Sequence, residues 1–366
     1  MEIEISQEKL SKALNIVSRV TSSKTGLPIL NNILFRTDES KLVLSATNLE
    51  VAIIDCISAK VIKPGTITIP ARLLTDFIGN LPKGTVNLSE KSGHLHIVSG
   101  NYKSTINGID SDDFPELPVL DEKEAVIFKI SIDDFKESVS QVSATSSNDT
   151  SRPALTGVYF NTFENNLYLA STDGYRLSEK LFIKDISREI KAIVPASSLQ
   201  EVLRSTSEEH EEIEILFDEN QVKFRLGDIE ITSKIIDSSF PDYRQLIPKN
   251  TEILTTLNKE ELLRITKLAG LFARESGGSI TIEANSKENL LSVQSVASEL
   301  GENSSSITTE VNGDGKITIN SKFLIDALNC ISEKEINFGF SGKMAPVVIK
   351  NRKSDDYVHI IMPLKS

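Results

Sequence analysis

The sequence reads Leu27-Pro28-Ile29-Leu30-Asn31-Asn32-Ile33-Leu34-Phe35 in its first third, and Arg152-Pro153-Ala154-Leu155-Thr156-Gly157-Val158-Tyr159-Phe160 stands 125 residues later. Two more pairs share this spacing: Ile5-Ser6 with Ile130-Ser131, and Ile69-Pro70-Ala71 with Val194-Pro195-Ala196. A fourth pair, Asp113-Phe114-Pro115 and Ser239-Phe240-Pro241, is 126 residues apart. The common spacing indicates an internal repeat, which has to be recognised before a fold is assigned.

A third and more divergent copy fills the rest of the chain. Leu257-Asn258-Lys259-Glu260-Glu261-Leu262 opens it, and Ile317-Thr318-Ile319-Asn320 lies 125 residues after Ala192-Ile193-Val194-Pro195. A chain of 366 residues is long enough for two or three domains. We therefore predict three domains, at residues 1–122, 123–248 and 249–366.

Each repeat carries two segments with apolar residues at helical spacing. They are Leu10, Ala13, Leu14 and Val17 with Leu74, Phe77, Ile78 and Leu81; Phe135, Val139 and Val142 with Leu199, Val202 and Leu203; and Leu262, Ile265, Ala269 and Phe272 with Leu324, Ala327, Leu328 and Ile331. Alternation at 41–44, 66–69, 222–226, 229–232 and 279–282 predicts half-buried strands. Each domain is expected to be a sheet-rich α+β unit with two helices on one side.

Composition limits the function classes. The net charge of −12 argues against binding nucleic acid with the average surface, although a concave face can be basic while the outside is acidic. No apolar stretch approaches the length of about 18 residues that a membrane span needs. Met1–Ile5 alternates like a strand and does not read as a signal peptide. Cys56 and Cys330 are expected to be reduced core residues of a cytosolic protein.

Motifs for catalysis are few. The chain has no glycine-rich dinucleotide or phosphate loop and no nucleophile elbow. His94 and His96 alternate on one strand and could form a pair of imidazole ligands, but no third ligand is evident nearby. Asp110, Asp112 and Asp113 could hold the metal of a nucleotidyl transferase. The following Phe114-Pro115, repeated at Phe240-Pro241 without the same acids, favours a structural corner.

Three motifs resemble the bacterial sliding clamp family, the β subunits of DNA polymerase III. They are Ser171-Thr172-Asp173-Gly174-Tyr175-Arg176-Leu177, Phe240-Pro241-Asp242-Tyr243-Arg244 and Ile361-Met362-Pro363-Leu364. Leu27-Pro28-Ile29-Leu30, Ile69-Pro70-Ala71-Arg72 and Asp113-Phe114-Pro115 are similar to the same family, and the likeness runs in order from residue 1 to residue 366.

The resemblance implies three clamp-type domains with sheets outside and two helices each inside, and a head-to-tail homodimer that forms a six-domain ring. It implies a DNA polymerase processivity factor, with no catalytic residue, no cofactor and no metal. Simple geometry agrees, because a compact domain of about 120 residues is roughly 35 Å across. Three such domains leave a gap of only about 5 Å and six leave about 35 Å, whereas a duplex is about 20 Å wide.

The resemblance also implies partners and sites. The partners would be duplex DNA without sequence specificity, the replicative polymerase catalytic subunit, the clamp loader, and repair and translesion proteins that carry clamp-binding peptides, all in the cytoplasm and away from membranes. The partner-peptide pocket would lie between the second and third domains and consist of Leu155, Thr172, Gly174, Tyr175, Arg176, Leu177, Pro241, Leu246, Asn320, Phe323, Val347, Ile360, Met362, Pro363 and Leu364.

Two further surfaces follow from the resemblance. Lys24, Arg152 and Arg204 are expected to face DNA, as are Lys12, Lys267 and Lys322. Ile106 of one chain is expected to face Leu271 and Phe272 of the other across the ring interface. Two other functions stay open at this point. A metal-dependent enzyme would use the three aspartates at 110–113, and a peptide-binding scaffold without a ring would be monomeric.

Overall fold

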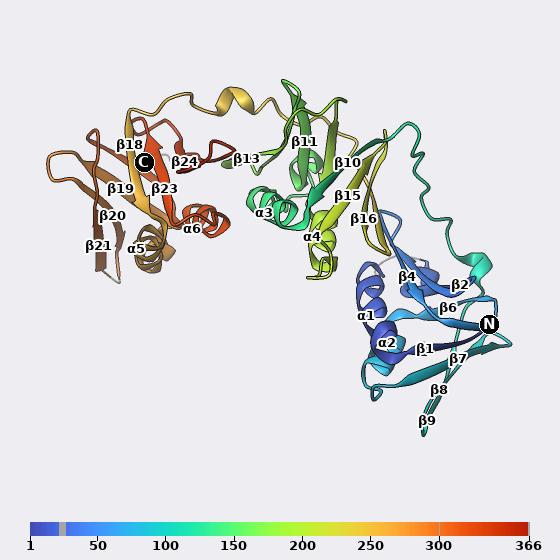
Figure 1. Ribbon diagram of the computed structural model, residues 1–366. Helices are drawn as coiled ribbons and strands as arrows, with labels where there is room; N and C mark the ends of the chain where they lie inside the picture. Colours follow the sequence, from blue (N-terminus) through green and yellow to red (C-terminus); the bar gives the residue numbers. More distant parts are fainter. Residues whose placement is uncertain (22–26, 300, 365–366) are drawn as a thin grey trace. The chain divides into compact units, whose positions relative to one another are not determined.

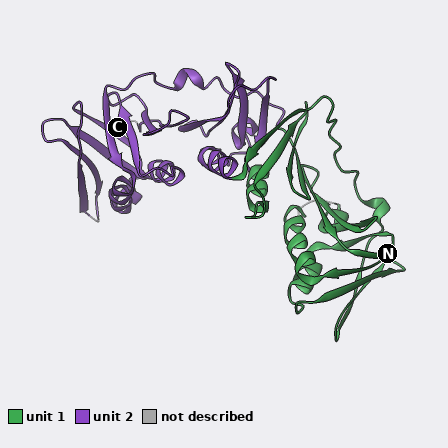
Figure 2. Ribbon diagram, viewed as in Figure 1, with its two compact units in different colours: residues 1–132, 197–235 green, residues 133–196, 236–366 purple. Residues whose placement is uncertain are grey.

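The computed structural model describes residues 1–21, 27–299 and 301–364, which form two compact units (Figures 1 and 2). Unit 1 consists of Met1–Ile132 and Ser197–Ile235, and unit 2 of Asp133–Ala196 and Ile236–Ser366. The second repeat therefore contributes to both units. Among the described residues, no helix is both long and apolar enough to cross a membrane.

Unit 1 contains two antiparallel sheets. The first has the strand order β5 (Lys60–Lys63), β1 (Glu2–Ser6), β7 (Thr85–Lys91), β8 (His94–Ser99) and β9 (Tyr102–Asn107). The second has the order β10 (Val126–Ser131), β15 (Glu212–Phe217), β16 (Gln221–Leu226), β17 (Ile229–Lys234), β4 (Val51–Ser58), β3 (Lys41–Thr47), β2 (Asn32–Asp38) and β6 (Thr66–Pro70). β17 pairs with β4, so this sheet joins the first repeat to the second.

Unit 2 repeats this arrangement. Its larger sheet has the order β14 (Lys191–Pro195), β11 (Gly157–Phe163), β12 (Asn166–Thr172), β13 (Arg176–Ile183), β25 (Tyr357–Ile361), β24 (Val347–Asn351), β23 (Glu335–Phe340) and β18 (Ile253–Asn258). Its smaller sheet has the order β21 (Gly301–Thr308), β20 (Leu290–Ala297), β19 (Ser279–Asn285) and β22 (Gly315–Asn320). β13 pairs with β25 and joins the second repeat to the third.

Six α-helices occur in the described residues: α1 (Gln7–Val17), α2 (Ala71–Gly79), α3 (Ile132–Ser143), α4 (Ala196–Ser205), α5 (Lys259–Phe272) and α6 (Ser321–Cys330). Short 3-10 turns lie at Ser18–Val20, Pro28–Asn31, Ser111–Asp113, Pro153–Thr156, Arg244–Leu246 and Ala273–Ser276. Within each unit the helices lie on one side of the sheets (Figure 1). The apolar stripe of α1 explains this placement, because Leu10, Leu14 and Val17 are fully buried.

The predicted α+β class and the six helical segments are confirmed, as are the five alternating strands, which correspond to β3, β6, β16, β17 and β19. Two residues of the predicted stripes, Leu81 and Ile331, are buried but follow the ends of their helices. Asn258 caps α5, since its side chain accepts a hydrogen bond from the backbone N–H of Glu261 at 3.1 Å. The domain boundaries after residues 122 and 248 stay predictions.

Candidate peptide-binding and DNA-facing sites

The turn between β12 and β13 forms one wall of the predicted peptide pocket. The Thr172 hydroxyl donates to the carbonyl of Arg176 at 2.7 Å and accepts from the N–H of Gly174 at 3.0 Å. The Asp173 carboxylate accepts from the N–H groups of Tyr175 and Arg176 at 2.9 and 3.0 Å. Gly174 has a φ of +92°, a conformation that costs glycine least. The residue types in this motif therefore define one turn geometry.

The C-terminal segment lies directly beside this turn. The backbone N–H of Met362 donates to the carbonyl of Tyr175 at 2.8 Å, and that of Leu364 donates to the carbonyl of Thr318 at 2.8 Å. Tyr175, Pro241, Leu246 and Met362 are exposed, while Pro363 and Leu364 are half-buried. Most of these side chains are apolar, as a peptide-binding surface requires, and their joining into one surface stays a prediction.

Arg176 is engaged by several contacts within the chain. Its Nε lies 3.0 Å from a carboxylate oxygen of Asp173, and its Nη1 lies 2.7 Å from one of Asp326. Its guanidinium also stacks over the Phe323 ring, 4.6 Å from the centroid. Arg176 and Thr172 thus fix the pocket wall, and a direct hydrogen bond from either to a peptide stays a prediction.

Most other members of the predicted pocket are buried or packed against the core. Leu155, Leu177, Val347 and Ile360 are buried, and Phe323 packs against the core of the third repeat. Asn320 caps α6 by accepting from the N–H of Lys322 at 2.9 Å, and it donates to the carbonyl of Gly277 at 3.2 Å. The predicted set therefore contains both exposed and buried side chains, and its role as a pocket stays a prediction.

Three of the predicted DNA-facing cations form ion pairs within the chain. Lys12 pairs with Glu209 at 2.5 Å, Arg204 with Glu201 at 2.7 Å and Arg152 with Asp149 at 3.4 Å. Lys267 on α5 and Lys322 on α6 are exposed, and Lys24 lies outside the described residues. In all three pairs the cation is more than half exposed, so each pair contributes little stability, and a DNA-facing role for these residues stays a prediction.

The predicted interface residues differ in accessibility. Ile106 is buried against its own sheet and pairs with Leu95 of β8, whereas Leu271 is 50% exposed and Phe272 half-buried. Ile106 lies on β9, which is an edge strand of its sheet, as expected for a residue at an edge; no pattern in the sequence indicated that β21, which contacts α5, is an edge strand too. An edge strand carries unpaired backbone groups that can pair with another chain.

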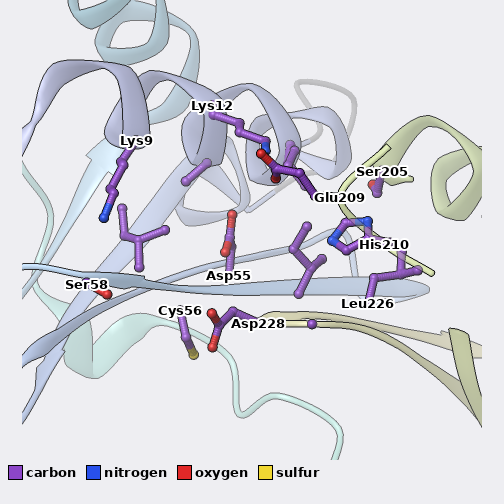
Figure 3. A pocket seen from close by; sticks show the side chains of 15 residues that line it. Lys9, Lys12, Asp55, Cys56, Ser58, Ser205, Glu209, His210, Leu226 and Asp228 are labelled. Carbon is purple, nitrogen blue, oxygen red and sulfur yellow. The ribbon is translucent and has the colours of Figure 1, made fainter. Parts of the chain in front are cut away.

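Sequence reasoning also missed a cavity in unit 1, between α1, β4 and the β16–β17 turn (Figure 3). Asp55 points into it and is only 5% exposed, and Lys12 and Glu209 lie across it. Burial raises the pKa of Asp55 to about 6, and the nearby Asp228 carboxylate contributes in the same direction. Asp228 itself pairs with Lys41 at 3.1 Å. The pairing of two distant segments creates this cavity, so no local sequence pattern signals it.

The alternative sites of the sequence occupy ordinary structural positions. His94 lies 3.0 Å from the Asn107 side-chain oxygen and His96 3.0 Å from the Thr105 hydroxyl, measured from Nδ1. The Asp110 carboxylate accepts from the N–H of Asp112 at 3.1 Å and begins a 3-10 turn. Within residues 1–21, 27–299 and 301–364, no three His, Cys, Asp or Glu side chains lie close enough together to hold a metal ion.

Comparison with known proteins identifies the family. The N-terminal, central and C-terminal domain models of the DNA polymerase III beta subunit match residues 1–118, 129–242 and 244–365. The beta sliding clamp of Staphylococcus epidermidis is 30% identical over 382 residues and that of Staphylococcus aureus 29% over 378 residues, with full coverage of both chains in each case.

A solved structure gives the same result. The DNA polymerase sliding clamp of Bacillus subtilis superimposes with a TM-score of 0.94 at 26% identity, covering 100% of this chain and 99% of the other. The resemblance and the three clamp-type domains are thereby confirmed. The chain belongs to the bacterial sliding clamp family, the DNA polymerase III beta subunits, which are non-catalytic processivity factors.

Proposed function

We propose that two copies of this chain close head to tail into a ring of six domains around duplex DNA. The observation that carries this proposal is that β9, which contains Ile106, and β21, which contacts α5, each stand at an edge of their sheet. If β9 of one copy adds to β21 of the other, both edges are satisfied and the interface occurs twice in the dimer. The exposed Leu271 would then be covered in the assembled ring.

Such a ring stays on DNA because it encircles the duplex, and it therefore needs no tight contacts with DNA. The net charge of −12 repels DNA from the average surface, while cations on the helices and before the Pro153–Thr156 turn would make weak contacts with phosphates. Lys12, Arg152 and Arg204 fit this requirement because their positive charges are partly compensated by neighbouring carboxylates. Sequence-independent phosphate contacts of this kind allow sliding.

The surface formed by Tyr175, Leu246, Met362, Pro363 and Leu364 is our proposed docking site for short peptides of the replicative polymerase, the clamp loader, and repair and translesion proteins. Met362 is flexible and apolar, which suits a site that accepts several partners. The protein would carry out this work in the cytoplasm. One site that takes peptides from many partners requires them to compete, and a dimer offers two such sites.

Retention on circular and linearised DNA tests the ring. The protein is assembled on DNA with a bacterial clamp loader and ATP, and then separated from unbound protein. Stable retention on circles, with loss when the circle is cut, supports topological linkage. Equal and salt-sensitive binding to both forms would contradict it, because phosphate contacts alone depend on salt and not on DNA ends. A known clamp loaded in parallel is the control, and failure of this chain alone would favour a monomeric scaffold.

A further inference from the structure

Unit 1 contains a groove where the first repeat meets the second. Its cavity of about 620 Å³ is lined by the β3–β4 turn, the end of β17 and the segment after the first Phe-Pro. Leu49, Glu50, Glu116, Val119, Lys234 and Ile235 contribute the side chains that matter here. We call this cavity the first groove, and the proposed pocket in unit 2 the second groove.

The turn in the first groove has the same hydrogen bonds as the turn in the second. The Thr47 hydroxyl donates to the carbonyl of Val51 at 3.0 Å and accepts from the N–H of Leu49 at 3.0 Å. The Asn48 side-chain oxygen accepts from the N–H groups of Glu50 and Val51 at 3.0 and 2.8 Å. Thr172 and Asp173 make the corresponding four bonds in unit 2.

The neighbouring strand is placed in the same way in both grooves. The N–H of Lys234 donates to the carbonyl of Glu50 at 2.9 Å, as the N–H of Met362 donates to the carbonyl of Tyr175 at 2.8 Å. The strand registers agree, since Val51 pairs with Ser233 and Arg176 with Ile361. The first groove therefore has the backbone frame of the second, with different side chains.

The main difference is Leu49, which occupies the position of Gly174. It has a φ of +75°, a conformation that is strained for a leucine, and its side chain is 43% exposed. Val119 is 88% exposed in the same groove, although its carbonyl accepts a hydrogen bond from the Gln221 side chain at 3.0 Å. Strained and exposed apolar residues on an ordered frame are more typical of a binding site than of a stabilising element.

The rim of the first groove defines the chemistry of an occupant. Glu50 is 3.7 Å from Lys234, and Glu116 forms no ion pair among the described residues. We propose that the first groove docks a short extended peptide in which apolar residues are flanked by basic ones. The apolar residues would contact Leu49 and Val119, and the basic ones Glu116 and Glu50. This inference rests, by analogy, on the proposed function of the second groove. The backbone frame and the side chains of the first groove do not depend on that function.

The probe is a fluorescein-labelled hexapeptide with a central Leu-Phe pair and two lysines on each side, titrated against the full chain by anisotropy. Leu49→Gly should weaken binding about tenfold, and it should fold because glycine suits this backbone conformation. Val119→Asp should weaken binding as much. Val296→Asp is the control, since Val296 is 67% exposed on β20 in the other unit. A peptide with glutamates in place of the lysines should bind more weakly.

Deleting Met362–Ser366 distinguishes binding at the first groove from binding at the second, because it alters only the second. If the deletion leaves binding intact and Leu49→Gly and Val119→Asp each weaken it about tenfold, the first groove is the site. If the deletion alone abolishes binding, the inference is wrong and the second groove stands. Unchanged affinity in both first-groove variants, or no binding up to millimolar peptide, would also overturn it. Polymerase binding to the same deletion variant reports on the second groove separately.

Discussion

The guanidinium of Arg176 lies 2.7 Å from the carboxylate of Asp326, which places an ion pair between β13 of the second repeat and α6 of the third. Arg176 is largely buried and Asp326 is half-buried, and Asp173 and Phe323 complete the surroundings of the arginine. The pair lies under the turn of the second groove. It links the stability of the junction between repeats to the shape of the proposed docking surface.

Replacing Arg176 with Ala should destabilise unit 2 by about 3 kcal/mol, because it leaves the Asp326 carboxylate partly buried without its partner. Arg176→Lys should recover only part of this loss, since lysine cannot bridge two carboxylates and stack on a ring at once. Calorimetric unfolding measures the effect. Arg152→Ala is the matched control, because the Arg152–Asp149 pair is exposed and should contribute less than about 1 kcal/mol. Equal losses in the two variants would contradict the assignment.

Local patterns predicted the helices, but not the contacts between repeats. The stripe of Leu10, Leu14 and Val17 follows from helical periodicity alone, so it could be read from the sequence. The pairing of Val51 with Ser233, by contrast, joins strands far apart in the chain and leaves no periodic signal. The same holds for the ion pair of Arg176 with Asp326, because the two residues lie in different repeats and no local pattern joins them. The first groove and the Asp55 cavity are products of such long-range pairing.

Asp55 should make the stability of unit 1 depend on pH. Its pKa is raised from 3.8 to about 6 by burial and by Asp228, only partly offset by Lys12. The folded chain thus holds this proton more tightly than the unfolded chain does, so stability falls as pH rises from about 4 through 6. Asp55→Asn should therefore increase the free energy of unfolding at pH 7.5 by on the order of 3 kcal/mol, and by far less near pH 4.

Urea unfolding at the two pH values, followed by a probe in unit 1, measures this difference. Asp38→Asn is the control, because Asp38 is an exposed acid on β2 of the same unit and its replacement should leave both midpoints unchanged. A gain from Asp55→Asn that is equal at pH 4 and pH 7.5 would mean that ionisation of Asp55 is not its cause.

Deleting Met362–Ser366 should abolish binding of the replicative polymerase catalytic subunit while the dimer persists. The deletion removes Met362, Pro363 and Leu364 from the second groove, but β25 ends at Ile361 and keeps its pairing with β13. Surface plasmon resonance against the polymerase subunit and sedimentation of the variant measure the two properties. Undiminished polymerase affinity would show that the docking surface lies elsewhere.

Charged replacements at the end of α5 should separate the dimer. Leu271 is 50% exposed and Phe272 half-buried, so an aspartate at either position can remain hydrated in the monomer but would be desolvated, without a partner, in the closed ring. Leu271→Asp and Phe272→Asp should therefore give folded monomers by analytical ultracentrifugation and lose retention on circular DNA. Leu254→Asp is the matched control, because Leu254 is 45% exposed on β18 of the same repeat and should leave the dimer intact. If both α5 variants remain dimers, the ring interface does not include the end of this helix. Pairing of the β9 and β21 edges would then have to close the ring alone.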